Sequence, residues 1–345
     1  MESRDLKFLV LGAGAIGGIT AALMKGKGYD VTLLCRSPEQ ASLISGSGLK
    51  ISGVCGEFTR KIEAYSSASE IPGKKDVILH ATKATDMVDA LRTVLPLLST
   101  DGIIVSLQNG ICEDELEAAA EGRRVIGCVT GWGATMETGN SLTMTSTGDF
   151  ILGYPDGKMD EQLLLVADAL SSVVPVKTTA NIMGHLYSKL IINSCITSLG
   201  AVCGLFLGEM LRSVKIRRIF IEIIREAVMV ADNMGLEMEV FGGRLDFRKF
   251  IEGNGALASL KRHLMIRMIG FKYRKLKSSS LQSLERGRPT EIDYLNGYIV
   301  RNGMKYNVNV HVNSAITGII HEIEQGKRKI NPENFNDPVF DSFSS

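Results

Sequence analysis

The sequence has almost no excess charge of either sign and no cysteine spacing typical of a metal site. It has 39 basic and 38 acidic residues, which leave a net charge of +1 and make no general electrostatic case for a nucleic-acid or anionic-membrane partner. The six cysteines form no C-x-x-C pair and lie largely in apolar or glycine-rich segments. We therefore expect reduced thiols in a cytoplasmic protein, with neither disulfides nor a metal site.

Internal repeats and low-complexity linkers are also missing, and the chain enters an apolar segment almost at once, which predicts no signal peptide. The length of 345 residues exceeds one typical core, so we expect two domains. The 19 residues Leu190–Gly208 carry no charge and are long enough to span a bilayer. However, Asn193, Ser194, Thr197 and three glycines interrupt this run. A buried helix pair in a second domain is therefore expected, without a membrane span.

The N-terminal half is organised around the segment Lys7–Gly18, with the sequence KFLVLGAGAIGG. Its apolar start predicts a buried parallel strand, which runs into G-x-G-x-x-G and then into a helix. In this context Gly12 allows a tight turn, Gly14 lets the backbone approach a pyrophosphate, and Gly17 lets the helix pack closely on the strand. An ordinary glycine-rich turn is the alternative, but the strand–turn–helix order favours a dinucleotide site. Its candidate cofactor residues are Gly12, Gly14, Ala15, Ile16 and Gly17.

The second expected strand, Asp30–Cys35, is followed directly by Arg36. In NAD-binding folds an acidic residue at about this position binds the ribose 2′-hydroxyl. An arginine suits a 2′-phosphate instead, because its guanidinium pairs with phosphate in a bidentate fork. Although Arg36 could also be a plain surface residue, we expect NADP(H) as the cofactor.

Apolar strands and helical patterns then alternate, with strands at 77–80, 103–107 and 125–129 and helices at 85–98 and 113–121. This alternation predicts a parallel, doubly wound sheet. Beyond it we expect an antiparallel extension that covers one side of the cofactor site (134–137, 141–145 and 150–153), a helix at 158–172 and a strand at 173–178. Ala134, in the extension, is a further candidate cofactor residue.

After Thr179 the pattern is helical, with expected helices at 214–234, 253–276, 290–302 and 313–325. Many cations lie within 261–277, but they mix with apolar residues, which indicates a solvated helix face more than a nucleic-acid patch. We thus predict an α/β protein, with an N-terminal Rossmann-type doubly wound sheet followed by an all-helical C-terminal domain. The expected parts are an NADP-binding domain at 1–180, a helical substrate and catalytic domain at 181–330, and a loose polar tail at 331–345.

Polar residues follow two of the predicted strands where ligands bind in open α/β sheets. Thr82-Lys83 comes after the strand ending at His80, and Gln108-Asn109-Gly110 after the strand ending at Leu107. Either group could be a plain turn, since Asn-Gly is a common turn pair. Two such turns directed at one crevice favour a site that includes Lys83 and Asn109.

The helical half contributes a third candidate group, Lys189, Asn193 and Thr197. Their spacing of four places them on one face of a helix. Because the helix is otherwise apolar, Lys189 either extends its charged end to solvent or is functional. Further on, Pro289-Thr290-Glu291 can also be understood as an ordinary helix start, with Glu291 at the positive end of the helix dipole.

Taken together, the sequence resembles the ketopantoate reductase (2-dehydropantoate 2-reductase) family over nearly its whole length. The resemblance is carried by the GAGAIG loop, Arg36, TK at 82–83, QNG at 108–110, SKLIINS at 188–194 and SSSLQSLERGRPTEIDYLNGYIV at 278–300. It implies that Lys189 is the general acid and that Glu291 helps to hold ligands as its catalytic partner. It also implies that Asn193, Thr197 and Ser279 bind substrate, while Lys83 and Asn109 line the boundary between cofactor and substrate. NADPH would deliver hydride to the C2 ketone of a 2-keto acid, and ketopantoate would yield pantoate, a precursor of pantothenate and coenzyme A.

Several positions depart from the family pattern. Thr197 stands where Asn followed by Pro is often found, and Leu207 where some members carry a further substrate-binding Asn. Ser280 and Ser283 replace the usual Met and Asp, and His311 lies near a usual Pro. These departures leave open another 2-keto acid or an imine as the substrate. A non-catalytic NADP-binding sensor is a third hypothesis, against which the presence of both Lys189 and Glu291 argues. A small-molecule substrate is the expected partner, and a homodimer is compatible with the sequence.

Overall fold

The computed structural model describes residues 2–343 and divides into two compact units, which we describe separately. Unit 1 extends to Leu186 and unit 2 begins at Tyr187. The division falls within the first turns of one long helix, α6 (Ile182–Cys203).

Unit 1 is built on an eight-stranded sheet in the order β12-β11-β8-β7-β6-β1-β2-β5. All neighbouring strands pair in parallel except β11, which is antiparallel to β8. The sheet is therefore mixed, and it confirms the predicted doubly wound architecture. The strands are β1 (Lys7–Leu11), β2 (Asp30–Leu34), β5 (Glu63–Tyr65), β6 (Lys75–His80), β7 (Leu98–Ser106), β8 (Arg124–Thr130), β11 (Phe150–Gly153) and β12 (Val176–Thr178).

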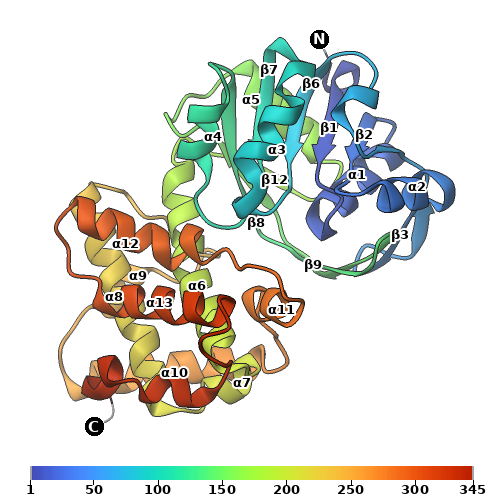
Figure 1. Cartoon of the computed structure of the whole chain (residues 1–345). Helices are drawn as coiled ribbons and strands as arrows, with labels where there is room; N and C mark the ends of the chain where they lie inside the picture. Colours follow the sequence, from blue (N-terminus) through green and yellow to red (C-terminus); the bar gives the residue numbers. More distant parts are fainter. Residues whose placement is uncertain (1, 344–345) are drawn as a thin grey trace. The chain divides into compact units, whose positions relative to one another are not determined.

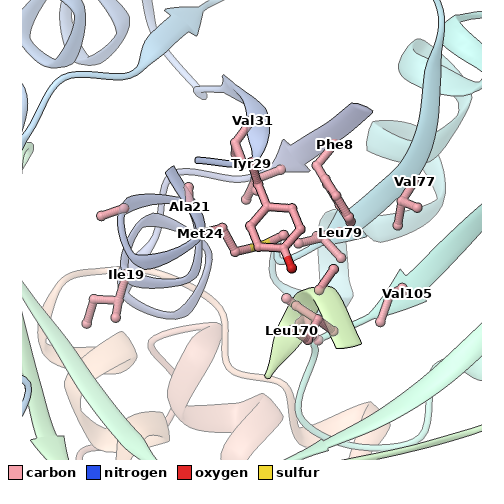
Figure 2. Packing of buried hydrophobic residues seen from close by; sticks show 14 of the residues in the cluster. Phe8, Ile19, Ala21, Met24, Tyr29, Val31, Val77, Leu79, Val105 and Leu170 are labelled. Atoms are coloured by element: carbon pink, nitrogen blue, oxygen red, sulfur yellow. The ribbon is translucent and has the colours of Figure 1, made fainter. Parts of the chain in front are cut away.

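Helices cover both faces of this sheet (Figure 1). Alternate residues of the parallel strands, such as Phe8, Val77 and Leu79, pack with helices α1 and α5 in one continuous apolar core. Figure 2 shows this packing, in which Tyr29 lies edge-on to Phe8 with ring centroids 5.9 Å apart. Helix α4 packs against β8 and against helix α3. The helices of unit 1 are α1 (Ala15–Gly26), α2 (Pro38–Ser47), α3 (Met87–Val94), α4 (Glu113–Ala119) and α5 (Glu161–Leu170).

A second, four-stranded sheet replaces the predicted antiparallel extension. Its order is β4-β3-β10-β9, in which β9 (Gly133–Thr138) and β10 (Ser141–Ser146) form a hairpin and β10 pairs in parallel with β3 (Leu49–Gly53). β4 (Phe58–Arg60) completes it, whereas β11 joins the main sheet. The expectation of one three-stranded extension was therefore wrong. Strands β3 to β5 and helix α2 were not predicted. The strands have only three to five residues, which give no measurable period, and the ten residues of α2 bury only Ala41 and Ile44.

Unit 2 is helical, which confirms the predicted fold class. Its helices are α6, α7 (Leu207–Met210), α8 (Val214–Met234), α9 (Phe247–Ile251), α10 (Ala256–Lys272), α11 (Ser279–Glu285), α12 (Asn296–Lys305) and α13 (His311–Glu324). Three 3-10 segments, η5 (Ile292–Tyr294), η6 (Pro332–Asn336) and η7 (Pro338–Phe343), complete it. The predicted helix at 290–302 begins only at Asn296, because Leu295 has non-helical dihedrals of φ −113° and ψ −103°.

The uncharged run at 190–208 is mainly one continuous helix, α6, followed by the short α7, instead of two similar helices. α6 is long and apolar enough to cross a bilayer, but 78% of its apolar window is buried. A core helix has this property, as predicted. The tail was expected to be loose, yet over residues 331–343 it is packed. Phe335 and Phe340 are buried there, and the Asn334 side chain donates to the Val202 carbonyl at 3.0 Å.

Candidate functional site

The glycine loop of unit 1 has the geometry that its three glycines predict. Gly12 has φ of +108°, and a Cβ there would lie 2.9 Å from the backbone of Ala81, at the end of the neighbouring strand. A Cβ on Gly17 would lie 2.2 Å from the Gly12 carbonyl oxygen. By contrast, a Cβ on Gly14 would meet no atom within 4 Å. Gly12 and Gly17 are therefore required by the fold, whereas at Gly14 the fold leaves open space for a ligand.

The first turn of α1 faces that open space with backbone donors. The Gly18 N–H bonds the Gly14 carbonyl at 2.8 Å, so the N–H groups of Ala15, Ile16 and Gly17 have no acceptor within the helix. The N-cap residue Gly14 makes no side-chain cap bond. Free donors and the positive end of the helix dipole suit a phosphate, so the residues present fit the dinucleotide that the motif predicts.

The remaining unit 1 candidates, apart from Ala134, lie at the same edge of the main sheet. Leu11 is in register with Leu34 and His80, and His80 with Ser106. The loops that carry Arg36, Lys83 and Asn109 therefore leave the carboxyl ends of adjacent strands, next to the glycine loop. Ala134 lies on β9 in the second sheet instead, half-buried and paired with Met144.

Arg36 is highly exposed, and its guanidinium lies 4.0 Å from the carboxylate of Asp86. An exposed ion pair of this length contributes little to stability. The guanidinium is therefore available to an anion, although Asp86 would compete with it.

A buried hydrogen-bond network joins the turns that follow β6 and β7. The side-chain amide of Gln108 donates to His80 Nδ1 at 2.9 Å and accepts from the Ser106 hydroxyl at 2.9 Å. Since an amide N–H can only donate, Nδ1 carries no proton, and His80 Nε2 donates to the Met87 carbonyl at 3.0 Å. The neutral imidazole thus links the strand before Lys83 to the turn that holds Asn109.

Two groups in this region have strongly shifted pKa values. Burial lowers the pKa of His80 from 6.5 to about 4, and His80 is fully enclosed. Glu113, at the start of α4, is also buried and accepts the Cys112 N–H at 2.9 Å. Its burial raises the pKa from 4.5 to about 7, although the hydrogen bond from the Cys112 N–H opposes the shift. His80 is therefore neutral near pH 7, whereas the Glu113 carboxyl is about half protonated there.

Gln40 of α2 holds the glycine loop from the other side. Its side-chain amide donates to the Ala13 carbonyl at 3.1 Å and to the Gly139 carbonyl at 2.9 Å. It therefore ties the loop to the β9–β10 turn. Gly18 allows β10 to approach α1, because a Cβ there would lie 2.4 Å from Leu142. Neither Gln40 nor Gly18 was predicted from the sequence as a site residue. The one signal for Gly18 was that it directly follows Gly17, which indicates that α1 packs closely on two of its sides.

In unit 2 the polar candidates share one side of α6. Lys189, Asn193 and Thr197 are partly exposed, whereas most of their neighbours on this helix are buried. The structure thus brings these three predicted residues together on one stripe. The Thr197 hydroxyl donates to the Asn193 carbonyl at 2.7 Å, so its proton is already used within the helix.

Ser279 and Glu291 come from different segments of unit 2. Ser279 is exposed in the first turn of α11, whose N-cap Ser278 packs against α6 at Gly200. Glu291 is half-buried and directly precedes η5, outside any α-helix, so its ordinary role as an α-helix start does not apply. The turn at Glu291 is held by Thr290, whose N–H and hydroxyl both donate to Glu324 at 2.7 Å.

A second buried network connects the helices of unit 2. Ser198 on α6 donates to Asn296 at 2.5 Å, and Asn296 donates to Asn313 at 2.9 Å. Asn313 donates to the Glu226 carboxylate at 2.7 Å, which also accepts the N–H groups of Val312 and Asn313 at 2.9 Å. Glu226 therefore caps the N-terminus of α13. The signal for it was present in the sequence, since this acid interrupts the apolar face of α8.

Two family models match the chain in its two halves. The model described as Ketopantoate reductase PanE/ApbA matches residues 8–157, and the model described as Ketopantoate reductase PanE/ApbA C terminal matches residues 181–324. A curated 2-dehydropantoate 2-reductase from Pyrococcus abyssi is 29% identical over 327 residues, which cover 94% of this chain and 100% of that protein. Another from Archaeoglobus fulgidus is 26% identical over 318 residues, or 92% and 97% of the two chains.

Solved structures share the fold. A PanE/ApbA family ketopantoate reductase from Ralstonia eutropha JMP134 superposes with a TM-score of 0.80 at 26% identity, covering 93% of this chain and 99% of that one. A ternary structure of D-mandelate dehydrogenase with NADH and anilino(oxo)acetate has a TM-score of 0.79 at 22% identity, with the same coverage. At that identity the likeness concerns the fold alone.

The glycine loop, the doubly wound sheet and the helical unit together define an oxidoreductase that uses a pyridine nucleotide. More specifically, the chain belongs to the ketopantoate reductase family, as its sequence predicted.

Proposed function

We propose that the protein reduces 2-dehydropantoate (ketopantoate) to pantoate with NADPH, a step toward pantothenate and coenzyme A. The family membership and the relatives that are named 2-dehydropantoate 2-reductases support this substrate. The six cysteines are free and five are buried, which suits a reducing compartment, so we also propose the cytoplasm as the location.

The observation that carries the proposal is the polar stripe of α6. Lys189 and Asn193, one turn apart, form a partly exposed polar stripe on a helix whose other residues are mostly buried and apolar. A bound nicotinamide supplies the hydride. We propose that the Lys189 ammonium stabilises the charge that develops on the substrate oxygen and donates the proton that completes the alcohol. Asn193 would hold the substrate by hydrogen bonds, and Ser279 and Glu291 would hold its other polar groups.

The buried network of unit 1 supports a positioning role in this reaction. Gln108 connects the turn that carries Asn109 to His80, which ends the strand before Lys83. We propose that this connection keeps Lys83 and Asn109 oriented toward the cofactor. His80 itself is fully buried and is a positioning residue, not a catalytic one.

Two departures from the family pattern weaken polar contact with a substrate at the C-terminal side of the stripe. Leu207 is buried, and the Thr197 hydroxyl donates within its own helix. The hydroxyl oxygen of Thr197 can still accept a hydrogen bond. Substrate recognition in this proposal therefore depends mainly on Asn193 and Ser279.

The test is NADPH oxidation by the full chain with a panel of 2-keto acids and cyclic imines that includes ketopantoate. We expect the highest kcat/KM for ketopantoate. A higher value for another 2-keto acid or an imine would keep the chemistry and replace the substrate. If no compound is turned over while NADPH binds, the protein is a sensor, and the proposed reaction is wrong.

A further inference from the structure

Five of the sixteen exposed large apolar residues in the described part of the chain lie on one helix. Five residues of α10 lie more than half exposed to solvent, in one stripe along the helix: Leu257, Leu260, Leu264, Met268 and Phe271. Elsewhere in the described chain the exposed large apolar residues are mostly scattered, which is normal for a surface. This concentration therefore indicates an interaction surface.

The opposite side of α10 already has its packing within unit 2. Ile266 is fully buried, and Gly270 allows Leu211 of the segment after α7 to approach, since a Cβ there would lie 3.0 Å from Leu211 Cβ. Arg262 donates to the carbonyls of Ile251, Glu252 and Gly253 at 3.2–3.3 Å, which caps the end of α9. The helix is thus held in place by its inner side. The stripe needs no contact within its own unit to keep α10 folded.

The width of the stripe favours a second helix as its occupant. At 100° per residue the five side chains fall within an arc of about 80°. An apolar face that covers a broad surface is at least 100° wide, whereas a narrower seam is typical of paired helices. Together they offer apolar surface on the order of 500 Å², and with the bordering residues this approaches the ~800 Å² that each partner buries in a standard interface.

The spacing of the stripe favours a second copy of the same chain. Relative to Leu264, the other residues lie at −7, −4, +4 and +7, so the pattern is unchanged when the helix is reversed. A two-fold axis through Leu264 brings Leu257 level with Phe271 of the partner subunit, and Leu260 level with Met268 of the partner subunit. Such a self-complementary patch is what an isologous dimer requires.

We infer that α10 is a dimerisation helix, which pairs antiparallel with α10 of a second copy about a two-fold axis at Leu264. The inference goes beyond the proposed reaction and does not depend on it.

The borders of the stripe are cationic, and these charges determine how the affinity of the dimer changes with salt concentration. Lys261, Arg267 and Lys272 are exposed beside it, and residues 253–284 contain no acidic side chain. In the dimer these cations repel those of the second copy across a solvated rim, and added salt screens the repulsion. Dimerisation should therefore tighten as salt rises. Binding to an anionic membrane would weaken under the same conditions.

The first experiment is sedimentation equilibrium of the full chain across the micromolar range at low and high salt. Leu264→Glu places two carboxylates at the axis and should raise the dimer Kd by roughly 100-fold or more. Leu164→Glu on α5 is the matched control, because Leu164 is 56% exposed and Leu264 is 57% exposed. We expect the control to dimerise like the unmodified protein, and both to do so more tightly at high salt.

The second experiment tests the position of the two-fold axis by disulfide cross-linking under mild oxidation. Leu264→Cys should form a disulfide with its own copy, whereas Leu257→Cys should cross-link only when mixed with Phe271→Cys. The unmodified chain provides the background, since five of its six cysteines are buried.

A monomeric protein at all concentrations would overturn the inference, as would equal dimerisation of Leu264→Glu and the control. Salt-weakened binding of the monomer to vesicles of anionic lipid, lost in Leu264→Glu, would also overturn it and assign the stripe to a membrane surface. Enzyme activity enters none of these measurements, so the reaction can be wrong while the dimer is right, and the reverse.

Discussion

The two units present their candidate residues by different physical means. In unit 1 the glycine loop is mainly a backbone site, in which positive φ at Gly12 and open space at Gly14 matter more than any side chain. In unit 2 the candidates are side chains on a helix, with Lys189 and Asn193 on one stripe of α6. A backbone site suits phosphate binding, and a side-chain stripe suits proton transfer. The proposed division, with cofactor binding in unit 1 and proton transfer in unit 2, rests on this difference.

The units also differ in how each holds a buried carboxylate. In the second network, Glu226 accepts two backbone N–H groups and the Asn313 amide, and His311 lies 3.2 Å away. Glu113 has fewer donors, and its burial raises the pKa to about 7. The pKa of Glu226 is raised as well, again because burial outweighs its hydrogen bonds. The comparison shows that several donors oppose the desolvation of a buried acid without removing it.

The largest expected effect tests the assignment of chemistry to unit 2. Lys189→Ala should lower kcat by about 10²–10⁴-fold, the usual range for general acid–base catalysis. NADPH affinity should change little, because the proposed phosphate site is the glycine loop of unit 1. Lys189→Arg should restore little of the lost kcat, since a guanidinium holds its proton too tightly to donate it. Measurements of kcat against pH should show a fall at high pH that the alanine variant lacks. Near-normal kcat in Lys189→Ala would instead make Lys83 the leading candidate.

The next largest effect is the pH dependence of the stability of unit 1, to which the buried groups His80 and Glu113 contribute in opposite directions. Protonation of unfolded His80 near pH 6.5 should lower the stability of unit 1 as the pH falls from 6.5 to about 4, because the folded pKa is about 4. Glu113 acts oppositely. Its stability contribution falls as the pH rises from 4.5 to about 7, because the folded form keeps its proton longer. Each effect amounts to about 3 kcal/mol, and the two largely cancel between pH 4.5 and 6.5.

Replacing either His80 or Glu113 should reveal the pH dependence of stability that the other residue causes. His80→Gln should leave a stability that declines toward neutral pH, and Glu113→Gln one that declines toward acid. Urea unfolding followed by tryptophan fluorescence measures this for unit 1 alone, because the single tryptophan, Trp132, is buried there. Parallel pH profiles for the two variants would contradict the opposed shifts.

A matched pair of glycine variants separates folding from binding within unit 1. Gly17→Ala should destabilise the unit by about 2–3 kcal/mol, because its Cβ would lie 2.2 Å from the Gly12 carbonyl oxygen. Gly14→Ala should change the unfolding free energy by less than about 0.5 kcal/mol, since its Cβ meets open space. It should nevertheless weaken NADPH binding, measured by fluorescence titration. Full cofactor affinity in Gly14→Ala would argue against a pyrophosphate at this position.

The smallest effect concerns cofactor choice, which depends on one exposed side chain. Arg36→Asp should weaken the binding of NADPH by roughly 1–3 kcal/mol, the value of a lost charge-assisted hydrogen bond, and should affect the binding of NADH far less. Asp86→Asn is the informative counterpart, because it frees the guanidinium that lies 4.0 Å from Asp86 and should tighten NADPH slightly. Equal affinity of the unmodified protein for both cofactors would contradict the preference.

The sequence by itself determined the features that depend on neighbouring residues. The strand–turn–helix of the glycine loop, the alternation of strands and helices, and the common stripe of Lys189, Asn193 and Thr197 all follow from local spacing. Local spacing suffices because backbone geometry and side-chain direction repeat with a fixed period. The family likewise followed from motifs spread along the chain. The roles of the individual site residues stay predictions.

Only the tertiary structure decided which distant segments meet. It joined β3 to β10 in a second sheet, connected His80 to Gln108, and placed the Glu226 carboxylate at the start of α13. It also left the apolar stripe of α10 exposed on a helix for which the sequence had predicted a solvated face. The physical reason is that periodicity shows which side of an element is apolar, whereas the segment that covers this side depends on the path of the whole chain.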